Sequence, residues 1–529
     1  MVTADRDGAV EPTASEGAAP PVEPPVVPDV PDLDPDPVFR TLRIVGAVVL
    51  ALWTVALVAF SSVIYHRVFL GEDFATYNQA WTLIGQGHLN PYDTVYGFPF
   101  VKADFELIVW PLALVHLVVP SPIVLLWIQD LAVAGSGLVA YLWALEYLER
   151  RRVDRRVVVA AAVAVLVATM GNPGTVSTLG FDVHMEPLST CFLLLAAREF
   201  WRGRPRRGWI WVAVVLLCGS FAALTVVGLG VSALLARPDT RRSGVLLVAV
   251  GLAWTGLISV LHANQGSGLS QYAYLAGRTT LPSAGGVVLV LGGIAAHPSR
   301  VVHQLGSRLG AMWVLIKPVG IVGLASAWGF GVPAVVLVTD GLNSQADFLN
   351  NAFQNFAVFP FLLVGTVMTL LRLGQRFRRG WAPAAVVAVV VTLVALDYGY
   401  RWTPAFVRGA VGQVQPGPAA RLRAGLAATP PDAQVIASLG IMGRFCSRAS
   451  CWFSDPNVPR PIERRTVVFV ISARNDATNT PAGTARGIAY VRNTLHARAL
   501  VVGDGVAVFL WHPPPGATRV TVPGVVPRA

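Results

Sequence analysis

Two adjacent carboxylates, Glu72 and Asp73, directly follow the first long apolar segment of the chain. At such a position a helix leaves the hydrocarbon layer and meets water. A carboxylate at this boundary can have its pKa raised by desolvation or lowered by a cation, and it can act as a general base towards an acceptor hydroxyl. We therefore treat Asp73 and Glu72 as candidate catalytic residues. The competing interpretation is a hydrated helix end whose charges only mark the interface.

Two further polar groups stand next to predicted helix ends, on the same side of the membrane as Glu72 and Asp73 in the topology derived below. Their members are Lys102, Asp104 and Glu106, and then Asp182, His184 and Glu186. His184 and Glu186 could ligate a divalent metal together with Asp73, although the run FDVHMEP has no pair of histidines one helical turn apart.

Several cations could contact a lipid phosphate. Lys317 is the most unusual of them because it lies in an apolar hairpin, where a charge is commonly functional, although a lysine can also extend to the interface. The cationic candidates are Lys102, Arg278, Arg300, Arg308 and Lys317. The predicted substrate-binding set is Lys102, Asp104, Asp182, His184, Glu186, Arg278 and Lys317.

The composition is that of a polytopic membrane protein. Of the 529 residues, 54% are hydrophobic and only 13% are charged, whereas a soluble domain carries about a quarter charged residues. The formal charge of +11 comes from short Lys and Arg clusters between apolar segments. Such clusters mark cytoplasmic loops, so we interpret the basicity as orientation and expect no nucleic-acid partner.

The first span sets the predicted orientation. Residues 1–39 are rich in Pro, Ala and acidic residues and are expected to be a disordered cytoplasmic tail. Arg40 and Arg43 flank the apolar segment from Thr41 to Tyr65 on its N-terminal side. By the positive-inside rule, the far end of this span lies outside. Between it and the next full span, a short amphipathic helix carrying Phe74, Tyr77 and Trp81 is expected to lie in the interface.

Two later segments are predicted not to cross. Phe105 to Val119 is only marginally long for a bilayer, and a crossing there would place the next arginine cluster outside, so it should dip back or lie along the outer surface. Trp209 to Leu235 has basic loops at both ends and Gly219 near its middle, so it should be a V of two short helices. Gly310 to Val322 and Ala325 to Val338 are expected to form a hairpin.

The predicted fold is an all-α polytopic membrane bundle of about ten passages with a small C-terminal extracytoplasmic α/β domain. Its transmembrane domain spans residues 40–397, with external loops at 66–121, 173–187, 263–308 and 339–355. Residues 398–529 form the C-terminal domain, where Ala497 to His512 reads as two strands around Gly503 to Gly505. An external location favours a disulfide between Cys446 and Cys451, whereas an internal one would leave two thiols.

The order of these features resembles a large family of bacterial multi-spanning membrane proteins of unknown function that are similar in architecture to GT-C glycosyltransferases. The resemblance rests on EDFATYNQAWTLIGQG, DFELIVWPLALVHLVVPSPIVLLWIQDLAVAGSGLVAYLWALEYLERR, FDVHMEPLSTCFLLLAAREF, NSQADFLNNAFQNFAVFPFL and PPDAQVIASLGIMGRFCSR. GT-C enzymes use a sugar carried on a polyprenyl phosphate or diphosphate, and an acidic residue in the first external loop serves as base or metal ligand. By position, the resemblance implies this role for Asp73, with Glu72 as its neighbour, and places an HxE-like element on His184 and Glu186.

The chain departs from this family at two places. Relatives usually carry a His before the dipping run, where this chain has Lys102, and an acidic or Lys-containing turn at the bend of the V, where it has Gly219. On the resemblance as a whole, we predict a glycosyltransferase-like protein that transfers a sugar from a polyprenyl-phosphate donor to an envelope acceptor. The alternatives are a non-catalytic protein that binds polyprenyl lipids or supports envelope assembly and, third, a transporter.

Overall fold

The structure is a computed structural model. It describes residues 36–524 except 68–69, 103–104, 173–174, 176–177, 179–181, 262–267, 283–284, 346–348, 350–353, 377–383, 386–387, 394–415 and 473–479. The predicted disordered tail therefore lies almost wholly outside the described residues, as does Asp104.

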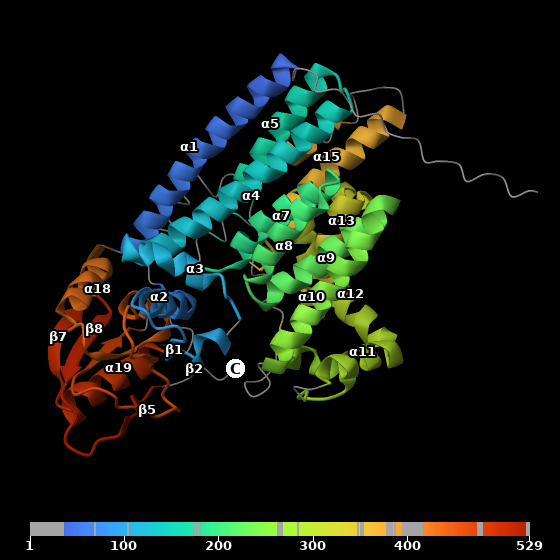
Figure 1. Cartoon of the computed structure of the whole chain (residues 1–529). Helices are drawn as coiled ribbons and strands as arrows, with labels where there is room; N and C mark the ends of the chain where they lie inside the picture. The colour runs from blue at the N-terminus through green and yellow to red at the C-terminus, as the bar shows by residue number, and fades with distance from the viewer. Residues whose placement is uncertain are drawn as a thin grey trace, which may run out of the picture.

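Most of the chain is an all-α bundle, as predicted (Figure 1). Its helices, in chain order, are α1 (Pro37–Arg67), α4 (Ile123–Arg150), α5 (Arg155–Gly171), α7 (Glu186–Trp201), α8 (Pro205–Leu216), α9 (Ser220–Ala236), α10 (Arg241–Leu261), α11 (Gly286–Ala296), α12 (Pro298–Ile316), α13 (Ala327–Gly341) and α15 (Val358–Arg376). In the described part of the chain four helices are long and apolar enough to cross a membrane, or five if α11 and α12, bent by 91°, form one broken span. The count of about ten passages stays a prediction.

The predicted V is confirmed. Helices α8 and α9 are separated by a short break at residues 217–219, where Gly219 has φ 109°. This backbone conformation suits glycine because it has no Cβ. The two outer ends of the pair lie together, since the Arg237 guanidinium after α9 donates to the Trp201 carbonyl before α8 at 2.6 Å.

The run from Phe105 to Val119 contains only short helices, each too short to span a bilayer, and its place on one side of the membrane stays a prediction. It holds only α3 (Val109–Ala113) and a 3₁₀ turn, Leu114–Leu117, after an earlier 3₁₀ turn at Phe100–Lys102. The amide of Ile108 donates to the Leu217 carbonyl at 2.8 Å, so this run is attached to the bend of the V.

The boundaries of the predicted hairpin were wrong on its first arm. Helix α12 begins at Pro298, inside the stretch predicted to be an external loop, and ends at Ile316 rather than Val322. A proline suits the first turn of a helix because its missing amide hydrogen has no partner there. The second arm, predicted from Ala325, is α13, which starts at Ala327.

Helix α2 (Glu72–Gly85) is present, but it is not the amphipathic interface helix that was predicted. Every residue from Phe74 to Leu83 is buried, including the polar ones. Asn78 donates to the Gly443 carbonyl at 2.8 Å, and Gln79 donates to the Arg448 carbonyl at 3.0 Å. The polar face of α2 is thus covered by the C-terminal domain instead of water.

The C-terminal domain is α/β. Its five-stranded sheet has the order β4-β3-β6-β8-β7, with β3 (Gln434–Ala437), β4 (Cys451–Phe453), β6 (Val467–Ile471), β7 (Arg498–Gly503) and β8 (Val506–Trp511), and the helices α18 (Pro416–Ala428) and α19 (Pro481–Ala489) accompany it. The first three strands are parallel, and β7 and β8 form the antiparallel hairpin expected around Gly503 to Gly505. Cys446 and Cys451 form a disulfide between the segment that covers α2 and strand β4.

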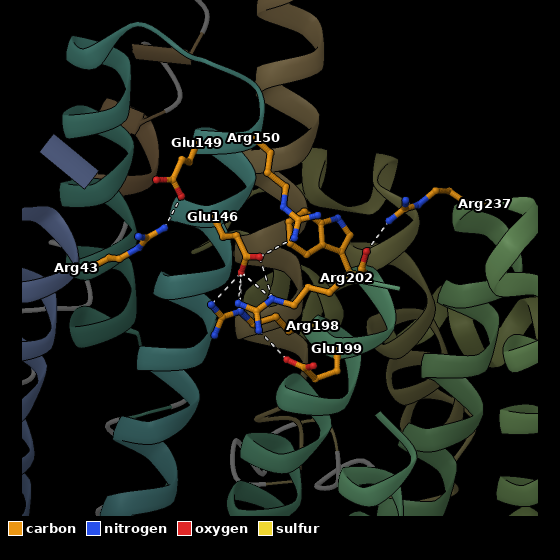
Figure 2. Close-up of polar contacts among 9 residues, drawn as sticks. Arg43, Glu146, Glu149, Arg150, Arg198, Glu199, Arg202 and Arg237 are labelled. Atoms are coloured by element: carbon orange, nitrogen blue, oxygen red, sulfur yellow. Dashed lines mark hydrogen bonds and ion pairs between the residues drawn. The ribbon is translucent and has the colours of Figure 1, made fainter. Parts of the chain in front are cut away.

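The arginine clusters meet at one end of the bundle, which we call the basic end (Figure 2). Arg43 near the start of α1 pairs with Glu149 near the end of α4. Glu146, one turn earlier on α4, accepts from Arg198 and Arg202 of the α7 terminus at 2.9 and 2.6 Å. The segments that the positive-inside rule assigned to one side are therefore neighbours in space.

Candidate functional site

The carboxylates of Glu72 and Asp73 lie in the first turn of α2, directly after the N-cap residue Gly71. Negative charge is stabilised at this end of a helix by the unpaired backbone amides and the helix dipole. A third carboxylate, Asp182, caps the helix from a different loop. Its Oδ2 accepts from the amides of Gly71 at 2.9 Å and Phe74 at 3.3 Å.

Gln129, within α4, holds the loop that carries Asp182 and His184. Its side-chain amide donates to the carbonyls of Thr178 at 3.0 Å and Asp182 at 3.3 Å. Its carbonyl oxygen accepts from the His184 amide at 2.8 Å. Both polar ends of one buried side chain are used, so α4 fixes the position of the loop against α2.

His184 lies between two carboxylates. Its Nε2 is 3.6 Å from Asp73 Oδ2, and its Nδ1 is 4.0 Å from Glu186 Oε2. Burial lowers the pKa of His184 to about 3, so the imidazole is neutral at neutral pH and these are not contacts between opposite charges. The exposed side-chain fractions are 9% for His184, 30% for Asp73 and 19% for Glu186, so Asp73 is the most accessible of the three to a substrate.

Asp182 has a higher pKa than an exposed carboxylate. Burial raises the pKa of Asp182 to about 6, the nearby charge of Glu72 raises it further, and the amides of Gly71 and Phe74 act against both. Desolvation is the largest of these effects. Asp182 therefore serves mainly to position the helix start, because its oxygens already accept the amides of α2.

Glu106 brings the second predicted group into the same region. The Tyr77 hydroxyl of α2 donates to Glu106 Oε1 at 2.8 Å, and this carboxylate is buried. Glu106 and Glu186 both lie close enough to the Cys218 thiol, at the bend between α8 and α9, to act on it electrostatically. The connection at Gly71, the loop of Glu106 and the loop from Asp182 to Glu186 thus converge with the V bend around the start of α2. We call this group of three loops and the V bend the carboxylate site.

The other predicted residues lie elsewhere or at the margin. Lys102 ends the 3₁₀ turn before the Glu106 loop and is exposed. Arg278 is exposed after the 3₁₀ segment Gly268–Ala276, which packs on α11. Lys317 caps the C-terminus of α12 beside a turn whose Val319 carbonyl accepts from Thr366 of α15. The sequence interpretation missed Gln129, although a glutamine beside an aspartate inside an apolar span is itself a signal of function.

A metal was considered from the sequence because His184, Glu186 and Asp73 carry suitable ligand atoms. Across the described ranges, no group of three or more His, Cys, Asp or Glu side chains is arranged to hold a metal ion.

The sequence matches the profile of a family described as "Predicted membrane protein (DUF2079)" over residues 71–450. The chain belongs to this family. The matched range begins at Gly71, the N-cap of α2, and ends at Ser450, so in this DUF2079 protein it runs from α2 through α15 to the segment that covers α2. The predicted membership in a family of multi-spanning membrane proteins is thereby confirmed.

Two solved structures are similar to this DUF2079 protein. A crystal structure of ArnT from Cupriavidus metallidurans bound to undecaprenyl phosphate has 13% sequence identity to this chain and a TM-score of 0.48. The match covers 88% of this chain and 97% of the ArnT chain. The apo-state crystal structure of the same protein has 14% identity, a TM-score of 0.46 and the same coverage. No curated protein matches the sequence.

Proposed function

We propose that this protein is a membrane glycosyltransferase of the GT-C kind, which moves a sugar from a polyprenyl-phosphate donor to an acceptor hydroxyl of the envelope. The observation that carries the proposal is the Asp73 carboxylate. It is partly exposed, lies at a helix start, and contacts a buried imidazole that stays neutral. A carboxylate in this setting can receive a proton without first breaking an ion pair with that imidazole.

In the proposed reaction, Asp73 accepts the proton of the acceptor hydroxyl while the hydroxyl oxygen forms a bond to the anomeric carbon of the donor sugar. The bond between that carbon and the phosphate oxygen breaks, and the phosphate leaves with the electron pair. Asp73 is preferred over Glu72 because Asp73 Oδ2 is 3.6 Å from His184 Nε2, within the group that Gln129 holds in place. His184 and Asp182 are positioning residues in this scheme.

We place the carboxylate site on the extracytoplasmic face. Gln129 and Arg150 are 21 residues apart on α4, which corresponds to about 32 Å along a helix and to the thickness of the hydrocarbon layer. The carboxylate site and the basic end therefore belong to opposite faces, and the positive-inside rule assigns the basic end to the cytoplasm. In this orientation the C-terminal domain, docked on α2, is also outside.

The leaving phosphate needs positive charge near it as its own charge develops. Lys102 is the proposed partner because it is exposed and belongs to the loop that carries Glu106. Arg278 and Lys317 stay proposed contacts of the donor lipid, although both belong to elements outside the carboxylate site.

The envelope glycans of cells test the proposal. Cells that make only the Asp73→Asn variant should lack the envelope sugar that the unchanged protein adds. Cells with Glu72→Gln, which removes the adjacent charge, should retain that sugar. Membrane abundance of each variant is measured in parallel by immunoblot. An unchanged glycan profile with Asp73→Asn at normal abundance would show the carboxylate to be unnecessary and would favour the non-catalytic lipid-binding function.

A further inference from the structure

A cavity of about 410 Å³ opens at the basic end, far from the carboxylate site. Four arginines line it: Arg150 and Arg151 from the end of α4, Arg237 after α9, and Arg372 from the last turns of α15. None of the residues that line it is acidic. Four cationic side chains around one space attract an anionic group.

The two nearby glutamates are bound mostly by arginines outside the cavity lining. Glu146 accepts from Arg198 and Arg202 as well as from Arg150, and Glu199 accepts from Arg202 at 2.7 Å. Figure 2 shows this group, with Arg150 paired to Glu146 and Arg237 pointing towards the group from another element. The arginines of the cavity thus keep excess positive charge that these glutamates do not neutralise.

Aromatic rings fix the geometry of the cavity wall. The Arg150 guanidinium lies 4.5 Å from the centroid of the Trp201 ring, and the Arg151 guanidinium lies 5.6 Å from that of Tyr147. Stacking on a ring leaves the edge of a guanidinium available for a second contact. That edge matches two oxygens of a phosphate, because the fork of an arginine can donate two parallel hydrogen bonds.

We propose that this cavity binds the phosphate head group of an anionic phospholipid from the leaflet at the basic end. The alternative source of the same chemistry is a soluble phosphate or pyrophosphate. The lipid is favoured because the cavity lies at the ends of apolar helices, with the Trp and Tyr rings that mark the membrane interface in its wall. Nothing in the reaction proposed for Asp73 requires this site.

The test compares charge-matched pairs of variants in neutral detergent. Arg151→Gln with Arg372→Gln removes two cavity arginines, whereas Arg206→Gln with Arg207→Gln removes two exposed arginines at the start of α8 that are not part of the lining. Phosphatidylglycerol should raise the midpoint of thermal unfolding of the unchanged protein and of the control pair. The cavity pair should require at least tenfold more phosphatidylglycerol for the same rise.

The proposal would be overturned if the cavity pair and the control pair needed the same increase in phosphatidylglycerol. It would also be overturned if phosphatidylcholine raised the unfolding midpoint as much as phosphatidylglycerol does. A rise with inorganic pyrophosphate and none with phosphatidylglycerol would overturn the lipid as the source. Native mass spectrometry of the unchanged protein with an equal mixture of the two lipids needs no variant. It should show preferential retention of phosphatidylglycerol, and equal retention of both lipids would contradict the proposal.

Discussion

Asp182 and His184 are two residues apart, and burial raises the pKa of the first and lowers the pKa of the second. The two shifts have opposite effects on how the free energy of unfolding depends on pH. Burial raises the pKa of Asp182 from 3.8 to about 6. The folded state therefore holds an extra proton between these values, and stability falls as pH rises through them. Over 2.2 units this amounts to about 3 kcal/mol, at about 1.4 kcal/mol per unit.

His184 has the opposite sign. Burial lowers the pKa of His184 from 6.5 to about 3, so the unfolded state holds the extra proton in this window and stability falls as pH drops through it. The slope is again about 1.4 kcal/mol per unit. Between pH 4 and 6 the two slopes cancel, so the contribution of this pair to stability is nearly flat.

Asp182→Asn removes one of the two slopes. The amide oxygen of an asparagine can still accept from Gly71, and the slope of His184 is then unopposed. The free energy of unfolding of the variant, relative to the unchanged protein, should fall by about 3 kcal/mol as pH drops from 6 to 4. Denaturant titrations in detergent micelles, followed by tryptophan fluorescence at half-unit steps of pH, measure this difference.

Asp504→Asn controls for removing a carboxylate as such, because that side chain is exposed in the C-terminal domain. A flat difference curve for Asp182→Asn between pH 4 and 6 would refute the reasoning, since the amides of Gly71 and Phe74 would then fully offset the effect of burial on the pKa of Asp182. A difference that grows in the opposite direction would refute it more strongly.

The remaining predictions concern the supports of the site. Gln129→Leu should destabilise the protein by about 1–3 kcal/mol, because it leaves the buried carbonyl of Asp182 and the amide of His184 without their hydrogen bonds to this side chain. Protection of the His184 amide in hydrogen exchange should fall in this variant. Unchanged protection would argue against the role of Gln129 in holding the loop. Gly443→Ala should loosen the C-terminal domain, because a Cβ there would lie 2.7 Å from the Leu70 carbonyl oxygen. Limited proteolysis should cut this variant faster than Gly487→Ala, where the nearest atoms are 3.2 Å away, and equal rates would contradict the docking role.

Basic clusters made much of the bundle predictable. They required the Phe105 run to stay on one side and the Trp209 segment to return, and the structure shows a short α3 and a broken α8–α9 pair at these places. The first arm of the hairpin was misplaced because α12 is strongly amphipathic and its polar face reads as loop. Hydropathy alone does not separate such a helix from an external segment.

The surroundings of α2 were not predictable from local pattern. Its polar residues Asn78 and Gln79 indicate a water-facing side, yet their partners are Gly443 and Arg448, more than 360 residues away in the chain. Distant packing overrode the local amphipathic pattern. The role of Gln129 in α4 was hidden for a related reason, since its partners lie 49 and 55 residues away in the chain.

Within the candidate site, the sequence interpretation named Asp73, Asp182, His184 and Glu186 as separate loop residues, and the structure brings them together around the start of α2. It also named Arg278 and Lys317, which belong to other elements. Charge in an apolar context indicated that these residues were unusual, but it carried no information about which of them are neighbours.

The most direct test of the central claim is sugar transfer by the purified protein. Unchanged protein, Asp73→Asn and Glu72→Gln are incubated with radiolabelled polyprenyl-phosphate sugars and an envelope extract as acceptor, and label in the acceptor fraction is counted. We expect Asp73→Asn to slow transfer by about 10²–10⁴-fold, the usual contribution of a general base, and Glu72→Gln to slow it far less. Transfer by Asp73→Asn at the rate of the unchanged protein would contradict the account.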